Sequence, residues 1–255
     1  MNPPAATTAP APEPAGSGAA GLLRAEGITV RFAGLTAVDG VDLDLAPGEI
    51  VGLIGPNGAG KTTCVNALTG FQPPDEGAVV VDGEEITALS PEARARAGVV
   101  RTFQGARLFT DLTVFENAEV SGVGIGRSRR EARERAAAAL EAVGLTELAT
   151  ARAGDITTGQ ERRLQVARAI AMAPRYLFLD EPAAGLNEGE TDELIETIAA
   201  IPSPSCGVLL IEHDMRVIMG SCDRIVVLDQ GKVIKVGSPA EVRADQRVID
   251  AYLGS

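Results

Sequence analysis

The sequence predicts an α/β protein with a mostly parallel sheet, and two patterns carry this prediction. In the first, an apolar run at 50–54 leads through a glycine-rich loop into a helical stretch at 63–68. In the second, helical stretches and short apolar runs alternate after Gly159. The strands expected there cover residues 176–180, 208–212 and 225–228. Such alternation is typical of parallel strands whose two faces are covered by helices.

Length and composition indicate a soluble cytoplasmic protein. The 255 residues, 45% of them hydrophobic, fit one large domain or two small ones. A net charge of −12 and only 3% aromatic residues argue against a nucleic-acid partner. No apolar run is long enough to span a bilayer, and no signal peptide is visible. Cys64, Cys206 and Cys222 are widely spaced, which suits free thiols in a reducing cytosol.

Along the chain, the first segment is expected to lack structure. Residues 1–21 hold five prolines and seven alanines, a composition that cannot bury enough apolar surface to fold. The folded domain is expected over 22–255. Its first β-type runs are expected at 27–32 and 78–81. From about 105 to 153 the pattern becomes helical and alanine-rich, and Ser238 to Glu241 form a capping box that starts a C-terminal helix.

A phosphate-binding loop is the most specific motif in the chain. Residues 55–62 match G-x-x-x-x-G-K-[ST] at every specified position, between an expected strand and an expected helix. The loop turns backbone N–H groups onto an anion, and the helix adds its positive N-terminal end. Lys61 is expected to reach the β- and γ-phosphates of a nucleoside triphosphate, and the Thr62 hydroxyl to ligate Mg²⁺. The predicted nucleotide contacts here are Gly55, Asn57, Gly58, Gly60, Lys61, Thr62 and Thr63. The alternative is an ordinary glycine turn ahead of a helix.

Two carboxylates end the expected strand at 176–180. In a doubly wound sheet, the carboxyl ends of the strands form the edge at which ligands bind. Asp180 is suited to hold Mg²⁺, directly or through water, and Glu181 to orient or deprotonate the attacking water. The alternative is a strand end that simply meets solvent.

His213, the only histidine, follows the apolar run at 207–211 and is therefore expected at the same edge of the sheet. Its neutral imidazole could hydrogen-bond a γ-phosphate or the attacking water, while the alternative is a structural histidine. Cys64 lies in the first turn of the helix after the phosphate-binding loop, where the helix dipole lowers the pKa of a thiol. We expect its alkylation to block nucleotide binding, with a small buried residue as the alternative.

The order and rough spacing of these motifs resemble those of ABC-type ATPases over about residues 22–255. The resemblance implies a P-loop ATPase fold with a mostly parallel sheet core, an antiparallel β subdomain and an α-helical subdomain over about 105–165. It also implies ATP as the nucleotide, with Mg²⁺.

The resemblance further assigns residues outside the strand ends. It implies that Phe32 stacks on adenine, and that Gln104 contacts Mg²⁺, assists catalysis and links the nucleotide to a membrane partner. The segment Ile156-Thr157-Thr158-Gly159-Gln160 is similar to the family's L-S-G-G-Q, which completes the site of a partner subunit across a dimer. Thr157, Gly159 and Gln160 are therefore further nucleotide contacts, while Thr158 replaces a glycine of the family pattern.

A narrower resemblance is to the ATPases of branched-chain amino acid importers. It rests on the segments 101–104, 107–109, 181–187, 211–215 and 251–254. The resemblance implies an ATPase subunit that powers amino acid import, attached to the inner face of the cell membrane through transmembrane permease subunits. A substrate-binding protein would act indirectly, and the second ATPase subunit would be a different chain, with a homodimer as the alternative. The segment Gln104 to Phe109 is expected to contact the permease.

Other systems remain open at this stage. A urea or amide importer has closely related ATPase subunits, and the cargo itself does not follow from the ATPase. A lipid or lipopolysaccharide exporter is a second alternative, against which the segment around Gln104 and the chain ending argue. A soluble ABC ATPase of cofactor assembly is the third.

Overall fold

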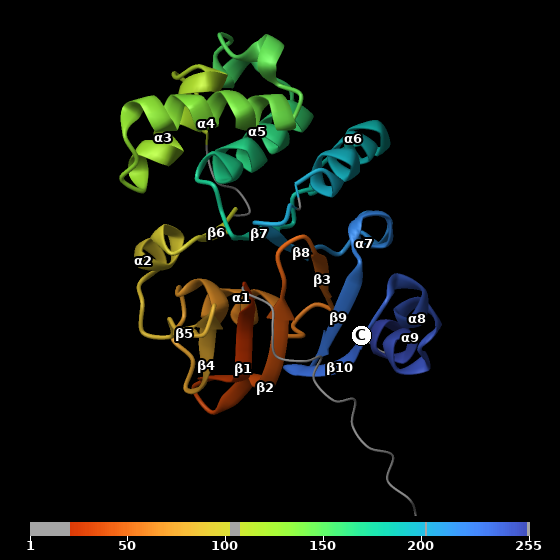
Figure 1. Cartoon of the computed structure of the whole chain (residues 1–255). Coiled ribbons are helices and arrows are strands. Elements are labelled where there is room, and N and C mark those ends of the chain that lie inside the picture. The colour runs from red at the N-terminus through yellow and green to blue at the C-terminus, as the bar shows by residue number, and fades with distance from the viewer. Residues whose placement is uncertain (1–20, 103–107, 202, 254–255) are drawn as a thin grey trace, which may run out of the picture.

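The computed structural model describes residues 21–102, 108–201 and 203–253. The tail predicted for 1–21 falls, except for Gly21, outside these ranges. Figure 1 shows two lobes, a lower one that contains the sheets and an upper one made of helices. The predicted fold class is confirmed, with a mostly parallel core, an antiparallel sheet and a helical subdomain.

The core of the lower lobe is a six-stranded sheet with the order β10-β9-β3-β8-β7-β6. Its strands are β3 (Ile50–Ile54), β6 (Val99–Arg101), β7 (Tyr176–Asp180), β8 (Gly207–Ile211), β9 (Arg224–Asp229) and β10 (Lys232–Gly237). Only β9 and β10 pair antiparallel; β6, β7, β8, β3 and β9 run parallel. β3 and β8 are buried along their whole length, which explains their uninterrupted apolar sequences.

The second sheet is antiparallel, with the order β2-β1-β4-β5. It consists of β1 (Leu23–Phe32), β2 (Leu35–Leu45), β4 (Glu76–Val81) and β5 (Glu84–Glu85). Buried and exposed residues alternate along the C-terminal half of β2, so only one face of this sheet is covered there. The helix α1 (Lys61–Thr69) contacts β1, β2 and β6, and its buried residues share one apolar core with residues of both sheets.

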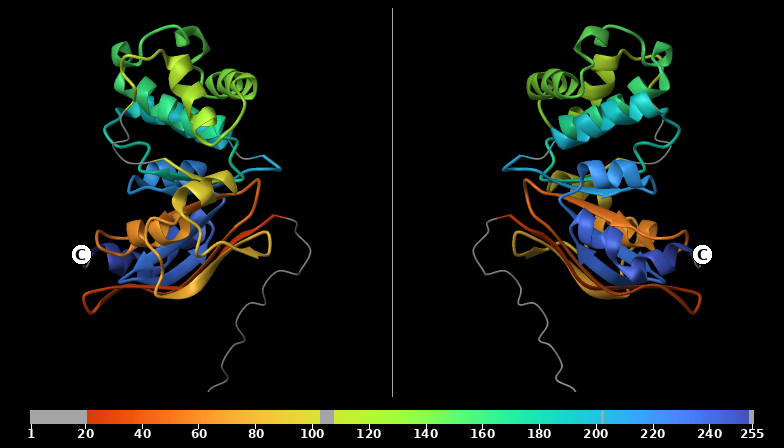
Figure 2. Two further views of the ribbon diagram at one scale, coloured as in Figure 1. Left: turned by 90° about the vertical axis from the view of Figure 1, so that its left-hand side faces the viewer. Right: turned by 90° about the vertical axis from the view of Figure 1, so that its right-hand side faces the viewer.

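The upper lobe consists of α3 (Val114–Gly124), α4 (Arg129–Ala142) and α5 (Thr158–Ala171), which pack on one another. Figure 2 shows from two further sides that these helices form a lobe beside the sheets, and their buried residues share one apolar core with strands of the parallel sheet. Short 3₁₀ turns at Thr146–Leu148 and Ala153–Asp155 connect α4 to α5. Capping boxes start α3 and α5, where Thr113 pairs with Glu116 and Thr157 with Gln160.

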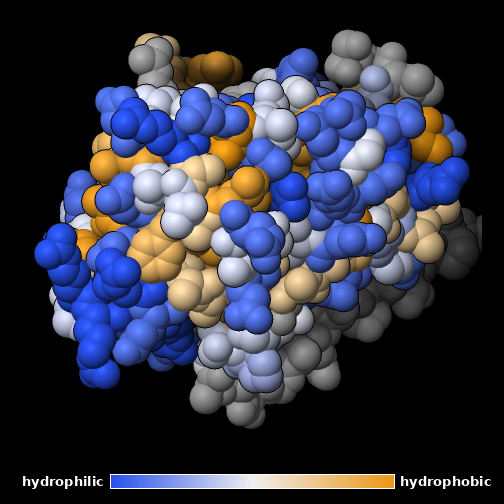
Figure 3. Space-filling view, turned by 90° about the horizontal axis from the view of Figure 1, so that it is seen from above, coloured by the Kyte–Doolittle hydropathy of each residue, from blue (hydrophilic) through white to orange (hydrophobic). Residues whose placement is uncertain are grey.

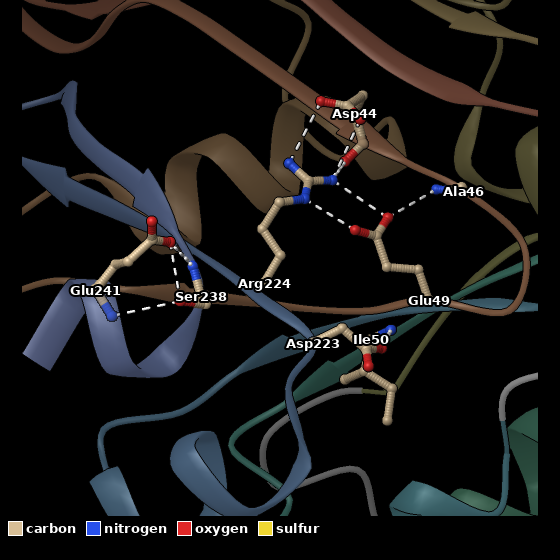
Figure 4. A network of polar contacts seen from close by, with 8 residues as sticks. All are labelled: Asp44, Ala46, Glu49, Ile50, Asp223, Arg224, Ser238 and Glu241. Atoms are coloured by element: carbon tan, nitrogen blue, oxygen red, sulfur yellow. Dashed lines mark hydrogen bonds and ion pairs between the residues drawn. The ribbon is translucent and has the colours of Figure 1, made fainter. Parts of the chain in front are cut away.

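The remaining helices are α2 (Pro91–Arg96), α6 (Glu188–Ala199), α7 (Met215–Ser221), α8 (Pro239–Ala244) and α9 (Gln246–Leu253). The capping box predicted at 238–241 starts α8, with mutual hydrogen bonds between Ser238 and Glu241 (Figure 4). Among the described residues, no helix has the length and apolar character needed to cross a membrane.

Arg224 ties the two sheets together near their edges (Figure 4). Its Nε donates to Glu49 Oε1 over 2.8 Å, and its Nη2 donates to the backbone oxygen of Asp44 over 2.9 Å. The neighbouring Asp223 carboxylate accepts from the N–H of Ile50 over 2.8 Å. The first residue of β9 thus connects the end of β2 with the start of β3, the strand that leads into the phosphate-binding loop.

Candidate functional site

The site is built at one edge of the parallel sheet, where four adjacent strands end. In the order β6-β7-β8-β3, their carboxyl ends lead to Thr102, Glu181, Glu212 and Gly55. The phosphate-binding loop, the Asp180-Glu181 pair and His213 therefore meet at the same edge, as the alternation of strands and helices predicted.

Two glycines of the loop are required by backbone geometry. Gly60 has a φ of 100°, and a Cβ there would lie 2.4 Å from the Ala37 oxygen of β2. Gly55 has a φ of 152°, and a Cβ there would lie 2.1 Å from the Leu228 oxygen of β9. Only residues without a side chain fit both positions. The loop is thus packed between β2 of one sheet and β9 of the other, and it continues directly into α1.

Lys61 lies over this loop. Its Nζ donates to the Gly55 oxygen over 2.6 Å and to the Pro56 oxygen over 3.0 Å. Partial burial lowers the pKa of Lys61 from its ordinary value, and the negative charge of Glu181 acts in the opposite direction. The Lys61 ammonium and the Glu181 carboxylate therefore interact electrostatically across the strand ends. A cation that faces the phosphates and a carboxylate that faces the attacking water are the two groups that phosphoryl transfer to water requires.

Asp180 and Glu181 diverge at the end of β7. The Asp180 carboxylate forms an ion pair of 2.6 Å with Arg101 Nη2, and both side chains are nearly buried. Arg101 Nη1 also donates to Asn66 Oδ1 of α1 over 2.6 Å, so that α1, β6 and β7 are connected. Glu181 has a φ of 46°, an uncommon conformation for a residue with a side chain. Such local strain of about 1–3 kcal/mol concentrates at functional sites.

The oxygen atoms available near this strand end suit Mg²⁺. The Thr62 hydroxyl is exposed in the first turn of α1, and Asp180 supplies a carboxylate. Both are hard oxygen donors of the kind that Mg²⁺ prefers, and Mg²⁺ usually takes only one or two protein groups besides phosphates and water. In the described part of the chain, no group of three or more His, Cys, Asp and Glu residues is arranged so that it could hold a metal ion. Gln104, the third predicted ligand, lies outside the described residues.

His213 is the first residue after Glu212, and its side chain is 66% exposed. Its Nδ1 lies 3.6 Å from Oε2 of Glu212, a carboxylate that is completely buried. Glu212 was not predicted as a site residue, because the sequence places it at the end of an apolar run that also fits a longer strand. The strand ends at Ile211 instead, and Glu212 contacts the two loops beside it.

Phe32 ends β1 in the hairpin between β1 and β2, and it is 45% exposed. The same hairpin approaches the phosphate-binding loop, because Ala37 of β2 is the residue that contacts Gly60. An exposed ring in this hairpin can stack on a nucleobase.

The segment 156–160 lies in the other lobe. Thr157 caps α5, and its hydroxyl accepts from the N–H of Gln160 over 3.4 Å. The N–H of Gly159 donates to Glu190 Oε1 of α6 over 3.2 Å. α5 belongs to the upper lobe in Figure 1, whereas the phosphate-binding loop and α1 belong to the lower one. The structure thus does not bring Thr157, Gly159 and Gln160 together with Lys61 in one chain.

The lowered pKa expected for Cys64 is wrong. Its thiol is completely buried in the core between the sheets, and burial raises its pKa to about 12. The favourable end of the α1 dipole does not compensate for the loss of water around a thiolate.

A groove of about 300 Å³ runs between α2, β6 and α5, with Phe71, Arg101 and Arg168 in its lining. Aromatic rings lie near it: Phe71 is 50% exposed and Phe109 is 49% exposed, with the Arg168 guanidinium 5.4 Å from the Phe109 ring centre. Figure 3 looks down on the helical lobe and shows hydrophobic residues exposed among hydrophilic ones on that face. Exposed apolar patches of this kind mark interaction surfaces.

Two family profiles match the chain. The family described as ABC transporter matches residues 38–184, and the one described as branched-chain amino acid ATP-binding cassette transporter matches residues 232–255. The high-affinity branched-chain amino acid transport ATP-binding protein BraF of Pseudomonas aeruginosa is 48% identical, over 91% of this chain and 98% of that protein. The corresponding protein LivG of Escherichia coli is 46% identical over the same shares.

The chain is also similar to a more distant relative and to a solved structure. The lipopolysaccharide export system ATP-binding protein LptB of Acidithiobacillus ferridurans is 35% identical, over 91% of this chain and 97% of that protein. The ADP conformation of MJ1267, an ATP-binding cassette of an ABC transporter, has a TM-score of 0.84 and 29% identity, over 92% of this chain and 99% of that chain.

Proposed function

The chain belongs to the family of ABC transporter ATP-binding proteins, and we propose that it hydrolyses ATP to power the import of branched-chain amino acids through a membrane permease. One observation supports branched-chain amino acids as the transported substrates. Relatives described as branched-chain amino acid transport proteins are 46–48% identical along almost the whole chain, and the C-terminal family match falls in the same subgroup. The exporter relative, at 35%, is more distant, so this observation favours import over the export alternative.

The residues at the strand ends are the ones to which we assign ATP hydrolysis. The N–H groups of the loop and Lys61 would hold the β- and γ-phosphates, and Phe32 would stack on the adenine. Glu181 would orient the water that attacks the γ-phosphorus and take up its proton, while His213 would hydrogen-bond the γ-phosphate. Thr62 and Asp180, with Gln104, would hold Mg²⁺, which when bound neutralises charge on the phosphate oxygens.

Binding of ATP would rearrange two contacts seen in the structure. The Lys61 ammonium would exchange the oxygens of Gly55 and Pro56 for phosphate oxygens. The Asp180 carboxylate, which pairs with Arg101, would turn toward the Thr62 hydroxyl. Thr157, Gly159 and Gln160 would complete the site of a second ATPase subunit, because they lie in the lobe away from Lys61. We infer a different chain as the natural partner, with a homodimer as the alternative.

The groove beside Phe71 and Phe109 would receive the permease. It lies next to Arg101, which contacts Asp180, so a permease segment in the groove would be connected to the nucleotide site by two side chains. Through this contact the protein would sit at the inner face of the membrane, with a substrate-binding protein acting on the far side.

Two substitutions test the hydrolytic assignment in the transporter purified with its co-expressed subunits. Lys61→Ala removes the charge that faces the phosphates and is expected to abolish ATP binding. Glu181→Gln keeps the shape and removes the charge, and is expected to bind MgATP like the wild type while single-turnover hydrolysis falls about 10²–10⁴-fold. Lys232→Ala and Glu188→Gln, which change exposed residues of the same kinds, serve as controls. If Glu181→Gln hydrolyses ATP within about threefold of the wild type, the base assignment is wrong and His213 becomes the candidate.

The substrate class is tested by uptake into proteoliposomes that contain this chain, its partner subunits and the binding protein. We expect ATP-dependent uptake of leucine, isoleucine and valine, and no uptake with Lys61→Ala. Uptake of urea or a short amide in place of these amino acids would contradict the proposed substrate while leaving the ATPase assignment intact.

A further inference from the structure

We propose that Glu212 is a positioning residue for ATP hydrolysis, because its carboxylate holds the loop that carries Glu181 and the loop that carries His213 in one fixed arrangement. The proposal rests on the roles proposed above for Glu181 and His213. It concerns a side chain that contacts neither the phosphate-binding loop nor Lys61 in the structure, and that would act through the backbone of its neighbours.

The contacts of Glu212 reach two loops at once. The side chain sits directly after β8 and is 1% exposed. Its Oε1 accepts from the N–H of Ala183 over 2.7 Å, two residues beyond Glu181. Its Oε2 accepts from the N–H of His213 over 3.1 Å and lies 3.5 Å from the N–H of Asp214. Each oxygen of one carboxylate thus serves a different loop.

A buried carboxylate in this place is costly unless it is fully hydrogen-bonded. Burial raises the pKa of Glu212, and the N–H groups of Ala183, Asp214 and His213 act in the opposite direction. An apolar residue of similar size would avoid the cost of desolvation but would leave the N–H of Ala183 without an acceptor. A carboxyl group buried at this place, with both of its oxygens hydrogen-bonded, therefore points to the arrangement that it imposes on the two loops.

The loop after Glu181 is held from its other side as well. Arg162 of α5 donates to the backbone oxygen of Ala184 over 3.0 Å. Glu181 itself has a strained φ and bonds through its N–H to the oxygen of Ile211, the last residue of β8. The loop thus has contacts to β8, to Glu212 and to the helical lobe, and Glu212 is the one side chain among them that also holds His213.

Misplacement of reacting groups by about 1 Å can cost about 10²-fold in rate. In Glu212→Gln one oxygen becomes an NH₂ group, which cannot accept a hydrogen bond, so one of the two loops loses its acceptor. We expect single-turnover hydrolysis by the purified transporter to fall about 10- to 100-fold, while the affinity for MgATP stays within about threefold of the wild type. A loss in the hydrolysis rate alone indicates a positioning role, because a smaller amount of folded protein would lower both the hydrolysis rate and the amount of MgATP bound.

His213 provides a second readout, since it is the only histidine in the chain. Its ring signal in ¹H–¹³C NMR spectra of the full chain is therefore unambiguous, and we expect Glu212→Gln to shift it. Ile211→Val serves as the matched control, because it changes the preceding buried residue without removing a hydrogen bond. This control is expected to leave both the hydrolysis rate and the ring signal near the wild-type values.

The possible outcomes distinguish the role proposed for Glu181 from the role proposed for Glu212. If Glu181→Gln hydrolyses ATP normally, the proposed role of Glu181 fails. If Glu181→Gln is inactive while Glu212→Gln hydrolyses ATP within about threefold of the wild type, only the role of Glu212 is overturned. An equal loss in Ile211→Val also overturns it. If Glu212→Gln does not fold, Glu212→Asp keeps the charge but is one methylene shorter, and the same expectations apply to it.

Discussion

The thiol of Cys64 experiences two opposing electrostatic effects. It lies in the first turn of α1, where the helix dipole favours a thiolate, and it is completely buried between the two sheets. Burial dominates, and the pKa of Cys64 is raised to about 12. Cys206 and Cys222 are also buried, and burial raises their pKa values to about 11 and about 12.

We therefore expect all three thiols to resist alkylation in the folded protein. At pH 8 the thiol of Cys64 is almost entirely protonated, and the reagent has no access to the core. Mass spectrometry after treatment with iodoacetamide is expected to find the folded chain unmodified, with or without ATP, and the chain unfolded in guanidinium fully modified. Labelling of Cys64 in the folded chain that ATP prevents would contradict this expectation.

At the residue scale, the sequence predicts which residues share the sheet edge but not which are buried. Asp180, Glu181 and His213 were placed correctly because each follows an apolar run, and parallel strands end at one edge. Cys64 and Glu212 were misjudged because their surroundings come from segments distant in the sequence. The one local signal for Glu212 is a carboxylate between an apolar run and the only histidine.

Among the elements, α1 carries the phosphate-binding loop at its start and depends on a buried arginine at its end. Arg94 of α2 is 1% exposed, and its Nη1 donates to the oxygens of Ala67 and Leu68, each over 2.7 Å. Its other nitrogens donate to the oxygens of Thr87 and Leu89. Burial lowers the pKa of Arg94, but a guanidinium remains charged and satisfies carbonyl groups that a helix end leaves without partners.

Arg94→Met is expected to lower the free energy of unfolding by about 3 kcal/mol, because it leaves buried carbonyl oxygens without donors. Chemical denaturation of the full chain measures this change, and Arg96→Met, which alters an exposed arginine of the same helix, is the control. A loss below about 0.5 kcal/mol would show that water or a neighbouring group replaces the guanidinium.

At this scale the central strands were predicted closely, whereas several peripheral elements were missed. The bounds of β3 and β7 equal the predicted ranges, because both strands are continuous apolar runs. β2 was missed although apolar and acidic residues alternate in its second half, the pattern of a strand with one covered face, and β10 was missed because it is a partly exposed edge strand. α2 was missed although Ser90 caps it and Pro91 is its first residue, which is a local signal of a helix start, whereas the burial of Arg94 has no such signal.

Across the whole molecule, the two lobes are joined by contacts between α5 and the segment after β7. Arg162 donates to Ala184, and the N–H of Gly159 donates to Glu190. The helical lobe could be predicted from the resemblance to ABC ATPases, but these contacts could not, because they join residues about 20–30 positions apart on different elements. Gly159 is also a residue proposed to face the nucleotide of the partner subunit.

The contact between Gly159 and Glu190 leads to a prediction for assembly. One N–H donates well to one acceptor, so the Gly159 N–H must leave the Glu190 carboxylate before it can donate to a phosphate of the partner's ATP. In the single chain, Glu190 thus occupies the place at the start of α5 that an anion would take. A Cβ at Gly159 would lie 2.7 Å from Glu190 Oε1, which shows how closely the two groups approach.

Glu190→Gln removes the charge while its side-chain oxygen can still accept from the N–H of Asn187 in the cap of α6. We expect the concentration of ATP that holds two ATPase subunits together to fall about three- to tenfold, since a neutral amide competes less well with phosphate for the Gly159 N–H. Gel filtration in MgATP of the Glu181→Gln chain with its co-expressed partner, with and without Glu190→Gln, measures this. Glu188→Gln removes the same charge from the same turn without touching α5, so an equal effect there would assign the change to the charge of α6 and not to the contact with Gly159.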